Sequence, residues 1–128
     1  MIAVDASAVL AILFDEPEAR AFRDLLTLEG GVMSPVNHWE VLVRARVKLG
    51  ETGPAEADAL LETLMVVVAP ASMDDSRSAA RAFGRFGKRA AGHLNLGDCF
   101  AYALAEREGG GLLFKGDDFP KTDVKSVA

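Results

Sequence analysis

The sequence contains little cysteine and little histidine. Cys99 is the only cysteine, so no disulfide bond can form within the chain, and such a sequence suits a reducing cytosol. The two histidines, His38 and His93, are too few and too scattered to predict a zinc site. Because no base lies near Cys99 in the sequence, this residue is more typical of a small core side chain than of a nucleophile.

Long apolar runs and an excess of positive charge are also missing. No apolar stretch has the length that a membrane-spanning helix needs. Asp5 interrupts the first apolar residues and no basic segment precedes them, so we expect no signal peptide and a cytoplasmic protein. The net charge of −5 argues against a protein that holds nucleic acid mainly by bulk attraction. A nucleic-acid role would need a local basic patch, bound cations or both.

What the sequence does contain is enough apolar residues for a core. Half of its 128 residues are apolar, which predicts one folded domain over residues 1–128. Short β-prone runs alternate with helix-prone segments, which favours a parallel sheet with helices on both faces. The predicted strands are 2–4, 32–34, 65–69 and 112–114, with a fragment at Val124. The predicted helices are 7–14, 17–28, 38–49, 54–64, 74–86 and 97–108. Ser7 and Asn37 are candidate N-caps, and the 65–69 run is the clearest buried strand.

Acidic residues recur at the ends of these predicted elements. Asp5 ends the first strand, Glu40 opens the helix after the second, Asp98 opens the helix before the fourth, and Asp117 and Asp118 follow the fourth. Because the carboxyl ends of parallel strands meet at one edge of a sheet, we expect these acids to converge there. Helix-start stabilisation and turn formation are the alternative explanations for all but Asp5. An acid in an apolar segment such as that of Asp5 costs desolvation unless it is paired.

Converging carboxylates repel one another unless a cation lies between them. All-oxygen ligation completed by water is the preference of Mg²⁺ or Mn²⁺. Acid-bound Mg²⁺ serves phosphoryl transfer and phosphodiester hydrolysis, because it lowers the pKa of bound water and screens charge on phosphate oxygens. The acids therefore predict this chemistry, with either one or two ions.

Basic residues form a stripe on the predicted helix 74–86 and just beyond it. Its arginines, four residues apart, are Arg77, Arg81, Arg85 and Arg89. A stripe near Asp98 could hold the phosphates of a nucleic-acid strand beside the metal. Arg85, Lys88 and Arg89 are the candidate substrate-binding residues. The alternative is a solvated helix face paired with Asp74 and Asp75.

At these residues the chain resembles a PIN-domain ribonuclease, specifically the VapC-type toxins of bacterial type II toxin–antitoxin pairs. The matching stretches are residues 4–8, the helix of Glu40, residues 94–105 and residues 112–119. The resemblance implies an α/β/α sandwich around a central parallel β-sheet, with a protruding helical hairpin over residues 37–64. It also implies an Mg²⁺-dependent endoribonuclease that cleaves RNA phosphodiester bonds and inhibits translation.

The resemblance also assigns roles to single residues. The acids that match the catalytic and metal-binding core of the family are Asp5, Glu40 and Asp98. Ser7 matches the polar residue that assists the first acid. Asp118 best fits the fourth acid and metal ligand, although Asp117 could equally reach the metal.

The partners that the resemblance implies are proteins and RNA. They are a small VapB-type antitoxin that blocks the acidic site, a tRNA or rRNA substrate, and a second copy of the chain in a homodimer; no membrane is involved. We expect exposed apolar surface for these contacts around residues 9–14 and 41–47.

Two other functions remain open at this point. A phospho-acceptor receiver domain is also a small parallel α/β unit, and Lys115 would be its lysine. It needs paired acids after the first strand and an acceptor Asp after the central one, where this chain has Ala6 and Pro70. The third function is an inactive PIN-like RNA-binding module, against which the full set of acids argues.

Overall fold

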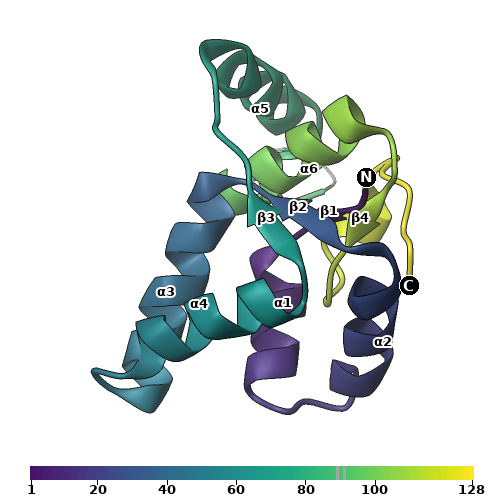
Figure 1. Ribbon diagram of the computed structural model, residues 1–128. Helices are drawn as coiled ribbons and strands as arrows, with labels where there is room; N and C mark the ends of the chain where they lie inside the picture. The colour runs from purple at the N-terminus through teal and green to yellow at the C-terminus, as the bar shows by residue number, and fades with distance from the viewer. Residues whose placement is uncertain (89, 91) are drawn as a thin grey trace.

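A four-stranded parallel sheet forms the centre of the protein. The computed structural model describes residues 1–88, 90 and 92–128. Its strands, in the order β3-β2-β1-β4 (Figure 1), are β1 (Ala3–Val4), β2 (Gly31–Met33), β3 (Val66–Val68) and β4 (Leu112–Leu113). The parallel sheet predicted from the sequence is confirmed.

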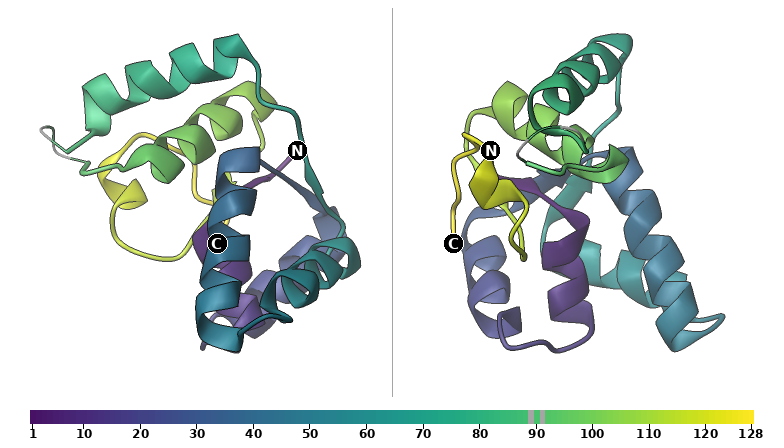
Figure 2. Two further views of the ribbon diagram at one scale, coloured as in Figure 1. Left: turned by 90° about the vertical axis from the view of Figure 1, so that its left-hand side faces the viewer. Right: turned by 180° about the vertical axis from the view of Figure 1, so that it is seen from behind.

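Helices cover both faces of this sheet. They are α1 (Ala6–Leu13), α2 (Ala19–Glu29), α3 (Pro35–Leu49), α4 (Gly53–Thr63), α5 (Met73–Phe86), α6 (Leu96–Glu108) and a 3₁₀ turn, η1 (Phe119–Lys121). Figures 1 and 2 show α5 and α6 on one side of the sheet and α1 to α4 on the other. Along β1 the side chains alternate accordingly: Val4 packs into the core beneath α1 to α4, and Ala3 into the core beneath α5 and α6. This is the expected α/β/α sandwich.

The order of the strands places β1 where the chain changes direction. From β1 the chain steps outward to β2 and β3, and then crosses back to β4 on the other side of β1. Because crossover connections are right-handed, steps in opposite directions put their helices on opposite faces. The crevice at such a reversal lies beyond the carboxyl end of the strands, where Asp5 follows β1.

The predicted helical hairpin is present. Helices α3 and α4 lie against each other and extend away from the sheet (Figures 1 and 2). A Cβ atom at Gly53 would collide with the carbonyl oxygen of Ala45, so glycine lets the two helices approach closely.

Two predicted helix caps were wrong. The side chain of Asp5, rather than Ser7, caps α1, and Ser34 caps α3 three residues before the predicted cap, Asn37. Pro35 occupies the first turn of α3, where its missing N–H has no consequence. Asn37 therefore lies inside the helix, and it is buried.

The strand predicted to be the most buried lies at the edge of the sheet. Val66 is in the core, whereas the Val67 side chain is 60% exposed on β3. The predicted fifth strand is reduced to a single bridge between Leu112 and Ser126. Within the described residues, no helix combines the length and apolar character that crossing a bilayer requires.

Candidate active site

Asp5 begins the site at the carboxyl end of β1. Its Oδ2 atom accepts hydrogen bonds from the backbone N–H of Ser7 at 3.0 Å and from the Ser7 hydroxyl at 2.6 Å. The same hydroxyl oxygen accepts from the backbone N–H of Lys115, after β4, at 2.9 Å. Ser7 thus orients the first acid and ties it to the loop of Asp117 and Asp118, which supports the assisting role that the resemblance gave it.

Asn37 links three segments of the site, and the sequence analysis did not include it among the site residues. Its Nδ2 atom lies 2.8 Å from Oε1 of Glu40, 3.0 Å from the carbonyl oxygen of Gly97 and 3.5 Å from Oδ1 of Asp5. The spacing of Asn37 and Glu40, three residues apart on a helix, was a signal that both share one face. Their partners on β1 and α6 could not be read from that spacing.

Glu40 and Asp98 are held against the beginning of α6. A Cβ atom at Gly97 would lie 2.6 Å from Oε2 of Glu40 and closer still to Oε1, so the Glu40 carboxylate occupies the space of the missing side chain. Asp98 forms a capping box with Asn95: the Asp98 N–H donates to the Asn95 side chain at 2.9 Å, and the Asn95 N–H donates to Oδ2 of Asp98 at 3.1 Å.

In each of these acids, hydrogen bonds therefore hold one carboxylate oxygen, and the second oxygen is available to a ligand. The Ser7 bonds hold Oδ2 of Asp5, the Asn37 amide holds Oε1 of Glu40, and the Asn95 N–H holds Oδ2 of Asp98. Of the second oxygens, Oε2 of Glu40 and Oδ1 of Asp98 accept no hydrogen bond from any described residue, and Oδ1 of Asp5 has only the long contact to Asn37. Such outer contacts orient metal ligands.

Burial and mutual repulsion raise the pKa values of these acids. Burial raises the pKa of Asp5 to about 6, against the lowering effect of its Ser7 bonds, and the charge of Glu40 adds to the rise. Burial likewise raises the pKa of Asp98 to about 6, with contributions from the charges of Asp5 and Asp118. The pKa of Glu40 is also raised, by burial and by the charge of Asp98. The four carboxylates thus act on one another.

Asp118 is a better candidate for the fourth acid than Asp117. Its charge contributes to the raised pKa of Asp98, whereas that of Asp117 is not among the causes. Asp118 directly precedes Phe119, which is buried and packs against Phe114 with ring centroids 5.0 Å apart. This aromatic contact anchors the position of Asp118.

The donor set fits a hard divalent cation. In the described part of the chain, no three His, Cys, Asp or Glu side chains already surround one point as ligands. Instead, the amide nitrogen of Asn37 lies between Asp5 and Glu40. Because Mg²⁺ is usually bound through one or two carboxylates and keeps several waters, three direct ligands are not required. Second oxygens from several acids therefore suit Mg²⁺ or Mn²⁺.

Of the predicted substrate-binding residues, Arg85 has partners other than these acids. Arg85 donates to the hydroxyl of Tyr102 at 3.3 Å and to Oδ2 of Asp123 at 3.1 Å, which ties it to the C-terminal segment. Lys88 is exposed, and Arg89 lies outside the described residues.

The remaining arginines have different partners. Arg77 pairs with Asp74 at 3.5 Å, as the alternative reading of the stripe predicted, but Asp75 pairs with Arg107 on α6. Arg44, one turn beyond Glu40 on α3, was not singled out from the sequence, and its charge reaches the site by lowering the pKa of Glu40.

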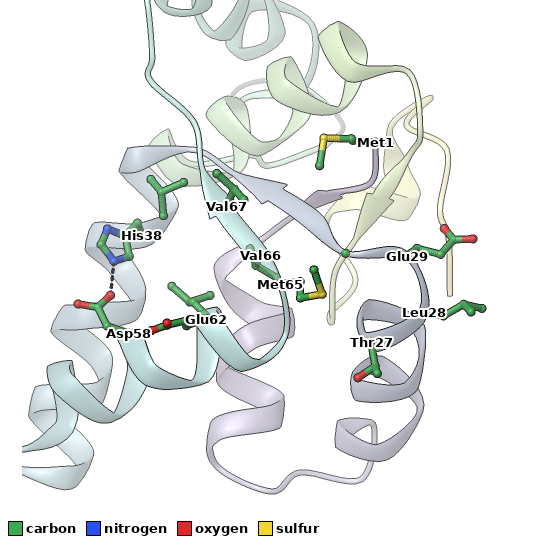
Figure 3. Close-up of a pocket in the computed structure, with 13 residues that line it drawn as sticks. Met1, Thr27, Leu28, Glu29, His38, Asp58, Glu62, Met65, Val66 and Val67 are labelled. Carbon is green, nitrogen blue, oxygen red and sulfur yellow. Dashed lines mark hydrogen bonds and ion pairs between the residues drawn. The ribbon is translucent and has the colours of Figure 1, made fainter.

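One pocket lies away from the acids. It has a volume of about 680 Å³ beside the edge strand β3, with Met65 and Val67 in its wall and the His38–Asp58 contact of 2.7 Å near it (Figure 3). A smaller pocket of about 280 Å³ adjoins the acidic site and is lined in part by Trp39 and Glu40. The acids therefore adjoin the smaller of these two pockets.

The fold and this group of acids define a protein class that the comparisons identify. The PIN domain family matches residues 2–125, and the chain belongs to that family. The predicted family is confirmed, and the receiver-domain alternative is excluded.

Individual relatives place the chain among the VapC proteins. It is 39% identical to ribonuclease VapC30 of Mycobacterium tuberculosis over 98% of this chain and 97% of that protein. It is 39% identical to ribonuclease VapC of Mycolicibacterium smegmatis over 97% of this chain and 98% of that protein. Among solved structures it resembles VapC20 of Mycobacterium tuberculosis, described as a sarcin–ricin loop cleaving toxin, with a TM-score of 0.77 and 16% identity over 98% and 97% of the two chains. That likeness supports the fold.

Proposed function

We propose that this protein, as a single PIN domain over residues 1–128, is an Mg²⁺-dependent endoribonuclease and the toxin of a type II toxin–antitoxin pair. The observation that carries the proposal is that Asn37 contacts both Asp5 and Glu40, while the charges of Asp5, Glu40 and Asp98 raise one another's pKa values. The ribonucleases VapC30 and VapC, to which the chain is similar over almost its whole length, support the same reaction.

The acids have distinct parts in this proposal. Asp5, Glu40, Asp98 and Asp118 would hold Mg²⁺, for which Mn²⁺ is the expected substitute. The bound ion supplies an acidified water and screening of the phosphate charge. Ser7 keeps Asp5 in place through its two hydrogen bonds, and Asn95 does so for Asp98.

Because the net charge of the protein is −5, an RNA substrate is not attracted by the protein as a whole and needs local cations. Arg44 is the cation whose charge acts on the acids, so we assign it a phosphate contact beside Glu40. Lys88 and Arg89 remain substrate-binding candidates, whereas the bonds of Arg85 to Asp123 and Tyr102 favour a structural role for that residue. We expect a structured tRNA or rRNA as the substrate, in the cytoplasm.

Cleavage of purified RNA tests this function. The protein should cleave RNA with Mg²⁺, should lose cleavage with EDTA, and should regain it with Mn²⁺. Asp98→Asn should be inactive at unchanged circular dichroism, because asparagine keeps the cap but loses the charge. Cleavage that persists in EDTA, or in Asp98→Asn, would contradict the mechanism, and RNA binding without cleavage would favour the inactive module.

The antitoxin surface that we propose is the pocket beside β3. Its walls are mostly apolar, and acids stand around it at Glu29, Asp58 and Glu62 (Figure 3). An antitoxin segment with apolar and basic side chains complements such a pocket. Expression should arrest growth, and co-expression of the antitoxin should relieve the arrest, but not for Val67→Asp. Relief that is undiminished in this variant would exclude the pocket as the binding surface.

The homodimer surface that we propose is an apolar patch beside the acidic site. Its exposed members are Trp39, Phe83 and Leu96, and Leu96 lines a pocket with each of the other two. Exposed apolar area of this kind marks an association surface. Of the surfaces expected from the sequence, Val9, Ile12 and Val41 belong to the core, whereas Val43 and Val47 are exposed. Leu96→Asp should reduce the mass in solution to that of the monomer; an unchanged mass would refute this interface.

A further inference from the structure

Asn37 is a fully buried amide in the first turn of α3. Its exposed fraction is 0%, and its Oδ1 atom has no hydrogen-bond partner among the described residues. Burying an amide costs free energy unless it is hydrogen-bonded, and an apolar side chain of similar volume would pack without that cost. The contacts of the amide therefore indicate why asparagine occupies this position.

The amino group of Asn37 faces three acceptors. The carbonyl oxygen of Gly97, at 3.0 Å, accepts a hydrogen bond whatever the charge of the acids, so the amino group rather than Oδ1 must face it. The second hydrogen is shared between Oε1 of Glu40, at 2.8 Å, and the more distant Oδ1 of Asp5, at 3.5 Å. Glu40 thus receives the shorter bond.

Gly97 also bounds the Glu40 carboxylate, and its missing Cβ atom would lie closest to Oε1, the oxygen that Asn37 holds. A Cβ atom at this position of α6 would lie 2.6 Å from Oε2 of Glu40, closer than real side chains approach. The carboxylate is enclosed between the Asn37 amide and the backbone of α6. This enclosure restricts a long side chain that would otherwise lose rotamer freedom on binding an ion.

We propose that Asn37 is a positioning residue that holds the Glu40 carboxylate against Gly97 and leaves Oε2 available to the cation. The inference rests on the proposed metal-dependent function. Asn37 acts through Glu40, and removal of such outer partners weakens metal affinity by about 10- to 100-fold.

Titration calorimetry of the full chain with Mg²⁺ tests the proposal through a double-mutant cycle. Asn37→Leu should weaken the Kd about tenfold, but less than about twofold in a Glu40→Gln background, because Asn37 then has no carboxylate to position. If Glu40→Gln binds too weakly to measure, Gly97→Ala replaces it: the added Cβ atom would displace the same carboxylate that Asn37 holds, so its loss and that of Asn37→Leu should not add. Additive losses in the measurable cycle, or no loss in Asn37→Leu, would overturn the proposal.

Ser34→Ala is the matched control. Ser34 is the other buried polar side chain at the start of α3; it accepts from the N–H of Val36 at 3.1 Å and contacts no acid of the site. Its loss should lower the melting temperature and leave the Mg²⁺ Kd unchanged, whereas Asn37→Leu should weaken the Mg²⁺ Kd. A wild-type chain that neither binds Mg²⁺ nor cleaves RNA would refute the proposed function, whereas normal Mg²⁺ binding by Asn37→Leu would refute this inference alone.

Discussion

Replacing Asp5 by asparagine should stabilise the metal-free protein while ending its activity. Burial raises the pKa of Asp5 from 3.8 to about 6, so the folded chain holds this proton more tightly than the unfolded chain does. The ionised carboxylate therefore weakens the fold. Stability should be lowest above about pH 6 and should rise as the pH falls from about 6 towards 4.

The size of the effect follows from the shift. A rise from 3.8 to about 6 corresponds to about 3 kcal/mol of destabilisation at neutral pH. Asparagine caps a helix as well as aspartate does, so the α1 cap is retained. Because a neutral amide accepts weaker hydrogen bonds from Ser7 than a carboxylate does, we expect a net gain of about 1–3 kcal/mol.

Thermal unfolding in EDTA, followed from about pH 5 to pH 8, measures this gain. The Asp5→Asn variant should melt several degrees higher at the upper end of that range, with a flatter pH dependence, and Mg²⁺ should raise its melting temperature less than that of the wild type. The matched control is Asp24→Asn on α2, which changes an exposed acid away from the site and should behave as wild type. A variant that melts lower than wild type at pH 8, or that keeps the wild-type pH profile, would refute the reasoning.

Two further predictions separate residues that the sequence grouped together. Asp118→Asn should slow RNA cleavage about tenfold or more, whereas Asp117→Asn should not, because the charge of Asp118 acts on Asp98. Equal cleavage rates for the two variants would refute this prediction. Arg85→Gln should lower the melting temperature and leave the KM for RNA unchanged, because Arg85 is bonded to Asp123 and Tyr102; a raised KM would instead support the substrate-binding hypothesis.

Local sequence was a good guide wherever a signal lay within one segment. The alternation of apolar runs and helix-prone stretches predicted the strands and helices to within a few residues, because strand and helix periods are written in consecutive side chains. The predicted start of α3 was wrong because Ser34, Pro35 and Asn37 are all typical of a helix start. Only the packing of the folded chain makes Ser34 the cap. The apolar run at β3 gave no sign of its place at the edge, since a strand covered on one face by neighbouring helices needs apolar residues as well.

The sequence by itself determined the parallel α/β class and the family, and it proposed the acids Asp5, Glu40 and Asp98, with Asp117 or Asp118 as the fourth. Only the tertiary structure decided how those acids are held. The amide of Asn37 meets Gly97 across 60 positions of the chain, and Arg85 meets Asp123 across 38. Contacts of this kind depend on how helices cross, and that geometry is set by the whole core rather than by any one segment.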